Sequence, residues 1–225
     1  MLDTRMTLMA ALCALSPAVA FAHGDVTPQP VNTDVLPDVG EEWLSENPYR
    51  AATAGEEVWA KAVQIGDSGF NQNCARCHGL GAVSGGLAPD LRYLEAEEYG
   101  DEWFVERFRH GMTQNGITKM PAFGDILGQK AAWAIRTYIE TRPDDGALEP
   151  YSDQLHKIRD ELAAGNADVP TVIATLEDIA GKVETASGAP VADSAVSRAA
   201  HELEKSPEKQ KEAADMLSIG ISAAE

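Results

Sequence analysis

The chain has 225 residues, and its 36 acidic against 18 basic side chains give a formal net charge of −18 at pH 7. Residues 23–150 carry 21 acidic and 10 basic side chains, and residues 151–225 carry 14 and 7, so both halves are negative. This balance excludes a nucleic-acid-binding surface. It is typical of a soluble protein or of one that docks to a basic patch on a partner.

Residues 1–22 have the pattern of a secretory signal peptide. Arg5 gives a weakly positive start, residues 6–19 form an apolar stretch, and Ala20-Phe21-Ala22 places small residues at the two cleavage positions. We therefore expect a chain that begins at His23 and is exported to the periplasm, with no stable membrane insertion after cleavage. The alternative is an uncleaved anchor, although the apolar stretch is short for a membrane span.

Residues 23–55 are predicted to form an extended N-terminal arm. Prolines in Thr27-Pro28-Gln29-Pro30 and Asn47-Pro48 interrupt any helix. Trp43 and Tyr49 can attach the arm to a neighbouring surface, and a coil with no fixed position is the alternative.

The pentapeptide Cys74-Ala75-Arg76-Cys77-His78 matches the attachment pattern of c-type haem. In this pattern Cys74 and Cys77 form thioethers with the haem, and His78 becomes a ligand of the iron. A zinc knuckle would need two more soft ligands, and the only other cysteine, Cys13, lies in the predicted signal peptide. A thioredoxin-like dithiol needs no adjoining histidine and usually lies in a βαβ pattern, which is absent here. The pentapeptide therefore predicts one covalently attached haem c.

Helical patterns flank the pentapeptide, and residues 56–146 are predicted to form the haem domain. Gly66, Phe70 and Cys74 recur at four-residue spacing, which places them on one face of a helix running into the motif. Gly66 would allow another helix to approach closely. No segment alternates enough to predict a strand, so the fold class is all-α. The other segments assigned in this region are a glycine-rich loop at residues 79–89 and helices at residues 101–108 and 129–140.

Residues 147–225 are predicted to form a helical extension of unknown role. They are rich in alanine and have no aromatic side chain after Tyr151. Start signals at Asp168 and Pro170 and a stop at Gly188 enclose one apolar helical stripe, and further stripes indicate three or four short helices in all. A structural or partner-contact role is the simplest interpretation, and a partly disordered tail is the alternative. The first stripe consists of Val172, Ile173, Leu176, Ile179, Ala180 and Val183.

The function of the iron depends on whether the protein supplies a second ligand. One ligand leaves a site open for gases or peroxide, whereas two close it and favour electron transfer. Met120 is the preferred candidate, because Pro121 fixes the chain direction behind it and 41 residues separate it from His78. Met112, His110 and an open site remain as alternatives. The methionines outside the signal peptide are Met112, Met120 and Met216.

With both ligand motifs in view, the chain resembles the class I c-type cytochromes. It is most similar to the PedF-type cytochromes c associated with quinoprotein ethanol oxidation. The resemblance covers residues 23–143, and residues 147–225 have no counterpart. The matching stretches are residues 23–31, 46–50, 70–80, 84–92, 120–123 and 133–136.

The resemblance implies a small helical fold around one haem and a role for several residues. His78 and Met120 would be the axial pair, and the carbonyl of Pro89 would accept a hydrogen bond from Nδ1 of His78, which raises the basicity of the ring. Arg92 would pair with a haem propionate, with a surface salt bridge as the alternative. The face carrying Gly66 and Phe70 would cross a later helix at residues 133–138.

The resemblance also implies a periplasmic one-electron carrier rather than an enzyme. Its donor would be a quinoprotein alcohol dehydrogenase that uses pyrroloquinoline quinone, and its acceptor a terminal oxidase or another cytochrome. The alternatives are a different periplasmic dehydrogenase as donor, or a haem peroxidase or gas-binding protein with a labile sixth ligand. A binding module, in which residues 147–225 tether the haem domain to a complex, is compatible with electron transfer.

Overall fold

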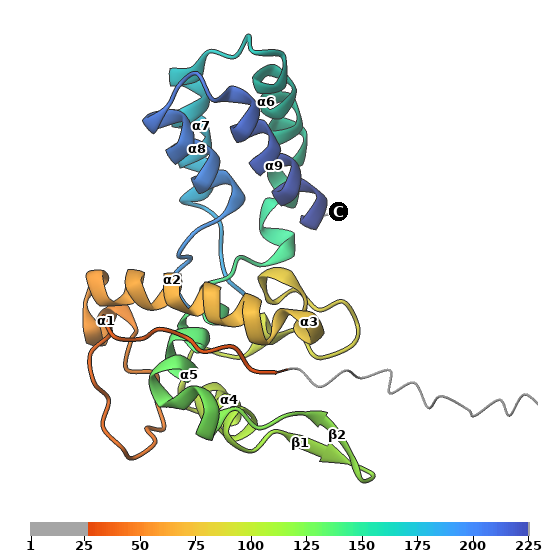
Figure 1. Ribbon diagram of the computed structural model, residues 1–225. Helices are drawn as coiled ribbons and strands as arrows, with labels where there is room; N and C mark the ends of the chain where they lie inside the picture. Colours follow the sequence, from red (N-terminus) through yellow and green to blue (C-terminus); the bar gives the residue numbers. More distant parts are fainter. Residues whose placement is uncertain (1–26, 225) are drawn as a thin grey trace, which may run out of the picture.

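The structure is a computed structural model that describes residues 27–224 (Figure 1). The predicted signal peptide and the expected first residue, His23, lie outside the described residues. None of the helices in the described range is long and apolar enough to cross a membrane. In chain order the elements are α1 Ala51–Ala54, α2 Glu56–Asn73, α3 Ala75–His78, the 3₁₀ helices η1 Leu80–Ala82 and η2 Leu91–Tyr93, α4 Glu98–His110, β1 Met112–Gln114, β2 Ile117–Met120, α5 Gly124–Glu140, the 3₁₀ helix η3 Asp145–Tyr151, α6 Ser152–Ala164, α7 Val169–Ala180, α8 Ala195–Lys205 and α9 Gln210–Ala224.

The helices form two groups, each with its own hydrophobic core. Helices α1–α5 and the two strands make up the N-terminal part, defined here as residues 27–146. Helices α6–α9 make up the C-terminal extension, residues 147–224, which lies above the N-terminal part in Figure 1. The fold is therefore mostly α-helical, as predicted.

The N-terminal part is organised around the crossing of α2 and α5. Gly66 lies at this crossing, and a Cβ atom at this position would overlap the carbonyl oxygen of Ala134. One turn further along α2, the ring of Phe70 packs against that of Tyr138, with centroids 5.4 Å apart. The predicted close approach at Gly66 is thus confirmed, because only glycine lets the two backbones come this near.

The prediction of no strand is wrong for residues 112–120. Strands β1 and β2 form an antiparallel hairpin in which Met112 is opposite Met120. Its turn is Asn115-Gly116, and both residues have positive φ, 53° and 76°. An Asn-Gly pair is a strong signal for a two-residue hairpin turn. The flanking strands have only three and four residues, which is too short for alternation to be visible in the sequence.

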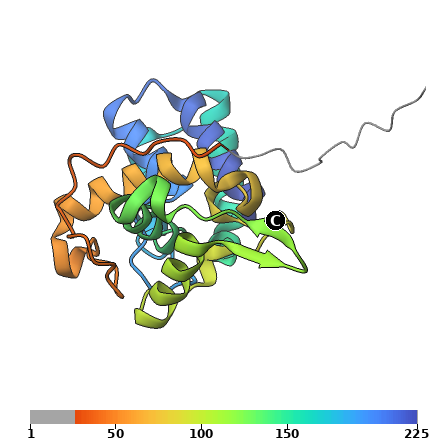
Figure 2. The ribbon, with the colours of Figure 1, turned by 60° about the horizontal axis from the view of Figure 1, so that its bottom comes forward.

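The N-terminal arm is packed against the rest of the N-terminal part. In both Figure 1 and Figure 2 it runs alongside α2, and the backbone N–H of Gln29 donates to Oδ1 of Asn73 at 2.7 Å. Tyr49 is 1% exposed, and its hydroxyl donates to the carbonyl oxygen of Pro37. Trp43 lies over the guanidinium of Arg109 at 5.0 Å. These contacts hold residues 27–50 in place without a helix.

A buried ionic network joins the arm to α4 and α5. Asp101 and Arg136 are fully buried and pair at 2.8 Å. Arg50, from the arm side, pairs with Asp101 and with Glu140, each at 2.8 Å. Buried charges are costly unless they are paired and hydrogen-bonded, so these four side chains constrain how the three segments assemble.

The C-terminal extension has a core of aliphatic side chains. Helix α7 starts after Asp168 with a proline in its first turn, and α8 starts with a capping box between Ser194 and Ser197. Leu162, Leu176 and other apolar side chains of the four helices interlock in a core that contains no Phe or Trp. The fully buried members at 1% exposure or below are Leu155, Leu162, Leu176, Ile179, Val196, Ala199, Leu203, Ala213 and Leu217.

The two parts are joined by several specific bonds at the end of α5. The Ser187 hydroxyl donates to the carbonyl oxygen of Glu140 at 2.5 Å. Arg142 pairs with Asp193 at 2.7 Å. The backbone bonds at this junction run from Ala96 N to Ser187 O (2.9 Å), from Asp144 N to Glu184 O (3.0 Å) and from Ala192 N to Thr141 O (3.3 Å). Segment 184–193 therefore supplies these bonds from the side of the extension.

Candidate haem-binding site

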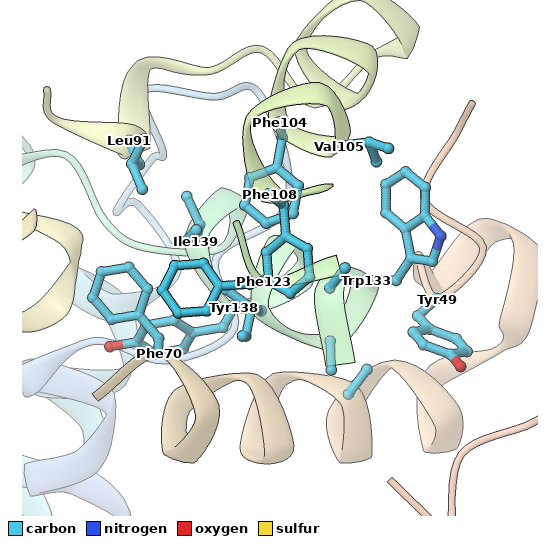
Figure 3. Close-up of a cluster of buried hydrophobic side chains, with 14 of the residues drawn as sticks. Tyr49, Phe70, Leu91, Phe104, Val105, Phe108, Phe123, Trp133, Tyr138 and Ile139 are labelled. Atoms are coloured by element: carbon cyan, nitrogen blue, oxygen red, sulfur yellow. The ribbon is translucent and has the colours of Figure 1, made fainter. Parts of the chain in front are cut away.

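An apolar cavity of about 430 Å³ opens between α3, α4, α5 and the β1–β2 hairpin. Its inner wall includes Phe104, Phe108, Phe123 and Ile139, which are buried side chains of the N-terminal core (Figure 3). Phe108 contacts both other phenylalanines, with ring centroids 5.8 Å away in each case. The cavity is therefore a hollow within the core, large enough for a flat apolar group.

The pentapeptide forms one wall of this cavity. Helix α2 ends at Asn73, and the chain continues as a short second helix in which His78 N donates to Cys74 O at 3.0 Å. This turn brings Cys74, Cys77 and His78 to the cavity together. Cys74 and Cys77 do not form a disulfide with each other.

The environment of Cys74 opposes a thiolate. Burial, and secondly the neighbouring Cys77, raises the pKa of the Cys74 thiol to about 12. Redox-active dithiols and zinc sites both use thiolates, so this position is poorly suited to either. Within residues 27–224, no three His, Cys, Asp or Glu side chains come together in a group that could hold a metal ion.

The histidine ring is oriented by the loop that follows the motif. Nδ1 of His78 lies 2.9 Å from the carbonyl oxygen of Pro89, and both residues line the cavity. A carbonyl can only accept, so Nδ1 carries the proton and Nε2 is the nitrogen left to bind a metal. The resemblance implied a hydrogen bond between these two groups.

The hairpin brings two methionines to the cavity. Met120 is half-buried against the core, whereas Met112 is 41% exposed, and both line the cavity. Gly111 has a φ of 66°, and a Cβ there would overlap the carbonyl oxygen of Met120. His110 does not line the cavity; its side chain is more than half exposed and lies 3.7 Å from Glu106.

Arg92 does not line this cavity. Its side chain is 3% exposed, and it pairs with Asp90 at 2.6 Å. It also donates to the carbonyl oxygen of Pro143 at 3.2 Å. Burial alone would raise the pKa of Asp90, but the hydrogen bonds from Arg92 hold that pKa below its usual range. The predicted propionate partner thus contacts Asp90 and lines a second cavity, of about 700 Å³, between the two parts of the chain.

The chain is similar to cytochrome c550 of Pseudomonas aeruginosa. The two are 52% identical over 124 residues, which is 55% of this chain and 83% of that relative. The chain belongs to the class I c-type cytochromes. It is an electron-transfer haem protein rather than an enzyme, and its cofactor is covalently bound haem c.

Further comparisons match shorter parts of the cytochrome. The family model for cytochrome c oxidase, cbb3-type, subunit III, matches residues 50–139. The quinohemoprotein alcohol dehydrogenase ADH IIB of Pseudomonas putida is 34% identical over 82 residues, 36% of this chain but 11% of that protein. The cbb3-type oxidase subunit FixP of Rhizobium meliloti is 26% identical over 111 residues, 44% of this chain and 36% of that subunit. No solved structure matches the cytochrome.

The donor groups of the cavity fit a haem c. Its lining supplies two thiols, an imidazole with Nδ1 bonded to a carbonyl, and methionine sulfur, within largely apolar walls. Reasoning from the sequence did not identify the basic side chains around the cavity. Arg76, Arg107 and Lys119 line the cavity, and among the described residues that line it none is acidic. Only the tertiary structure brings these cations together, because they come from three separate elements.

Proposed function

We propose that this cytochrome carries one electron at a time on a single haem attached through Cys74 and Cys77 and ligated by His78 and Met120. The supporting observation is that one apolar cavity is lined by all four of these residues. When bound, the haem iron supplies a one-electron couple, and methionine ligation raises its potential relative to two nitrogen ligands.

The protein's own residues have three tasks in this proposal. The Pro89 carbonyl holds the His78 ring in one tautomer and one orientation. The phenylalanine wall excludes water, which keeps the surroundings of the cavity at low dielectric. The hairpin, with Gly111 at its base and Pro121 at its end, sets the position of Met120.

We further propose the division of the chain that the sequence indicates. Residues 1–22 would be a signal peptide for export to the periplasm, 23–55 an arm, 56–146 the haem domain and 147–225 the extension. Export is consistent with covalent haem attachment, which takes place outside the cytoplasm in bacteria.

The proposed electron donor is a quinoprotein alcohol dehydrogenase that uses pyrroloquinoline quinone, and the proposed acceptor is a terminal oxidase or another cytochrome. Support comes from the matches to a quinohemoprotein alcohol dehydrogenase and to an oxidase subunit. Partners would dock at the opening of the cavity, where Leu87 is 70% exposed and Arg76 and Lys119 are also exposed. Complementary charges there would speed association.

The donor is tested by mixing the oxidised cytochrome with a purified quinoprotein alcohol dehydrogenase and alcohol, and timing haem reduction by stopped flow. We expect fast reduction that requires both enzyme and substrate. If reduction is no faster than in mixtures without the enzyme, this dehydrogenase is excluded as the electron donor. Lys119→Gln should slow the reaction at low salt, whereas Lys182→Gln, the same change on the extension, should not.

The ligand pair is tested by spectroscopy of the isolated cytochrome. We expect a low-spin reduced form and, in the oxidised form, a weak near-infrared charge-transfer band from methionine sulfur. High-spin iron, or rapid binding of carbon monoxide to the native reduced protein, would contradict the closed site and favour the peroxidase or gas-binding alternative.

A further inference from the structure

Hydrogen bonds to the Asp90 carboxylate close the loop that carries Pro89. The Asp90 carboxylate accepts hydrogen bonds from the backbone N–H of Ser84 at 3.4 Å and of Arg92 at 3.0 Å. It also accepts two from the Arg92 side chain, from Nε at 3.0 Å and from Nη2 at 2.6 Å. The Ser84 hydroxyl in turn donates to the carbonyl oxygen of Ala88 at 2.5 Å. The Pro89 carbonyl, which orients His78, therefore lies inside a loop that is closed by a bidentate ion pair between Asp90 and Arg92.

The other side of Arg92 contacts the junction with the extension. Its Nη1 donates to the carbonyl oxygen of Pro143 at 3.2 Å. Pro143 is paired with Thr185 in an isolated β-bridge, and the next residue, Asp144, donates its N–H to Glu184 O at 3.0 Å. A continuous series of bonds thus runs from the extension, through Arg92, to the loop that contacts the histidine.

We propose that Arg92 is a positioning residue through which the C-terminal extension holds the His78 acceptor in place. This inference rests on the proposed ligation of the iron by His78. It gives the extension, which has no counterpart in the resemblance and lies beyond the match of the family model, a role at the haem.

Arginine suits this role better than lysine because its planar fork makes several hydrogen bonds at fixed angles. Arg92 uses that fork for Asp90 and Pro143 at once, and at 3% exposure its geometry is held by close packing. A lysine at this position keeps the charge but cannot bond to both partners in the same geometry.

The consequence is a change in the basicity of His78. The bond from Nδ1–H to the Pro89 carbonyl makes the ring a stronger donor to iron, which favours the oxidised state. If the loop loosens, this bond weakens, the ferric form loses stabilisation and the midpoint potential rises.

The first test is Arg92→Lys in the full-length holoprotein, measured by equilibrium redox titration. At a fixed potential near the midpoint we expect the ratio of reduced to oxidised protein to rise about threefold, about 28 mV at 59 mV per tenfold for one electron. The matched control is Arg198→Lys, which alters an ion pair with Asp193 on the extension and should leave the potential unchanged. A purely structural Arg92 would change thermal stability but not the potential, and that result overturns the proposal.

The second test removes the link on the extension side. Asp144→Pro deletes the N–H that donates to Glu184, and the φ of −68° at this residue suits proline. Asp144→Ala loses the same carboxylate but keeps the N–H. We expect Asp144→Pro, but not Asp144→Ala, to raise the midpoint potential, by less than Arg92→Lys does. Equal potentials in Asp144→Pro and Asp144→Ala overturn the coupling. If Arg92→Lys does not fold, this pair decides the question.

Different measurements would contradict the proposed function and the proposed role of Arg92. Wild-type protein that lacks the spectrum of histidine and methionine ligation contradicts the proposed function. Wild-type protein with that spectrum, together with unchanged potentials in Arg92→Lys and Asp144→Pro, contradicts only the role of Arg92.

Discussion

The N-terminal part and the C-terminal extension bury their apolar side chains in different ways. The N-terminal core is rich in aromatic residues, encloses an ionic network and lines a cavity of about 430 Å³. The extension is built from leucine, isoleucine, valine and alanine that interlock among four helices. The haem would fill the cavity of the first core, whereas the apolar side chains of the four helices fill the interior of the second core themselves.

The physical reason lies in packing. Side chains that line a cavity lack contacts on one side and lose the dispersion energy of those contacts, so a bound group contributes strongly to the stability of such a fold. Amphipathic helices that meet face to face have no such requirement. We therefore expect the N-terminal part to depend on haem and the extension to fold without it.

The largest effect is expected when the haem is no longer attached. In a variant with Cys74→Ser and Cys77→Ser, no thioether can form, and mass spectrometry should find the protein without covalent haem. Hydrogen exchange should then show loss of protection in α2 to α5, while α6 to α9 keep theirs. Equal loss of protection in both parts would contradict the independence of the extension.

A second variant separates the methionine of the cavity from one in the extension. Met120→Ala should open the sixth position, permit carbon monoxide binding and lower the potential by on the order of 100 mV, because axial ligands set haem potentials. Met216→Ala removes a half-buried side chain of the extension core, and should leave the spectrum and potential unchanged. An unchanged spectrum in Met120→Ala would point to Met112 as the ligand.

A third variant targets the extension core. Leu176 is fully buried, and Leu176→Ala should cost about 2–5 kcal/mol of the stability of the extension through lost contacts and a cavity. Circular dichroism should report earlier melting of part of the helical signal, with the haem spectrum retained. Exposed Glu177→Ala is the control on the same helix, with an expected change within about 0.5 kcal/mol.

Glycine substitutions compare backbone packing in the two parts. Gly66→Ala places a methyl group against the Ala134 carbonyl and should cost about 1–3 kcal/mol in chemical denaturation. Gly181→Ala, at the end of α7, meets its nearest atom at 3.5 Å, an ordinary contact, and has a helical φ of −68°. It should be neutral or stabilising by up to about 1 kcal/mol. A Gly66→Ala variant as stable as wild type would show that α2 and α5 can move apart freely.

The smallest effect is expected at the junction and depends on pH. Burial alone would raise the pKa of Asp193, but Arg142 and Arg198 hold that pKa below its ordinary value of 3.8. A carboxylate with a lowered pKa in the folded state contributes stability above its ordinary pKa and loses it as the pH falls through the lowered value. Asp193→Asn should therefore be less stable than wild type at pH 7, and the difference should shrink in acid. A constant difference across that range would contradict this pairing.

Much of the helical framework was visible in the sequence because it depends on residues close together in the chain. The predicted helix at 101–108 lies within α4, Glu98–His110, and the one at 129–140 lies within α5, Gly124–Glu140. α5 starts earlier, at Gly124, because its first turn precedes a break in the helical angles at Gly128, and the predicted helix began only after that break. The hairpin was missed although Asn115-Gly116 signals it, because its strands are too short to alternate.

The ionic network of Asp101, Arg136, Glu140 and Arg50 had no signal in the sequence. Each residue lies on a face that could equally have been exposed, and charged side chains are usually found at the surface. Burial of Asp101, Arg136 and Glu140, and their pairing with the partly buried Arg50, follow from how the arm, α4 and α5 assemble, which local patterns do not specify.

The sequence by itself determined the covalent chemistry of this cytochrome, because two thiols and an imidazole within five residues suffice to specify haem attachment. Only the tertiary structure decided what surrounds that site. It placed Met112 beside Met120, put three cations around the cavity, and turned Arg92 towards Asp90 and the extension. The reason is that these contacts join residues far apart in the chain, and their geometry is set by the packing of whole elements.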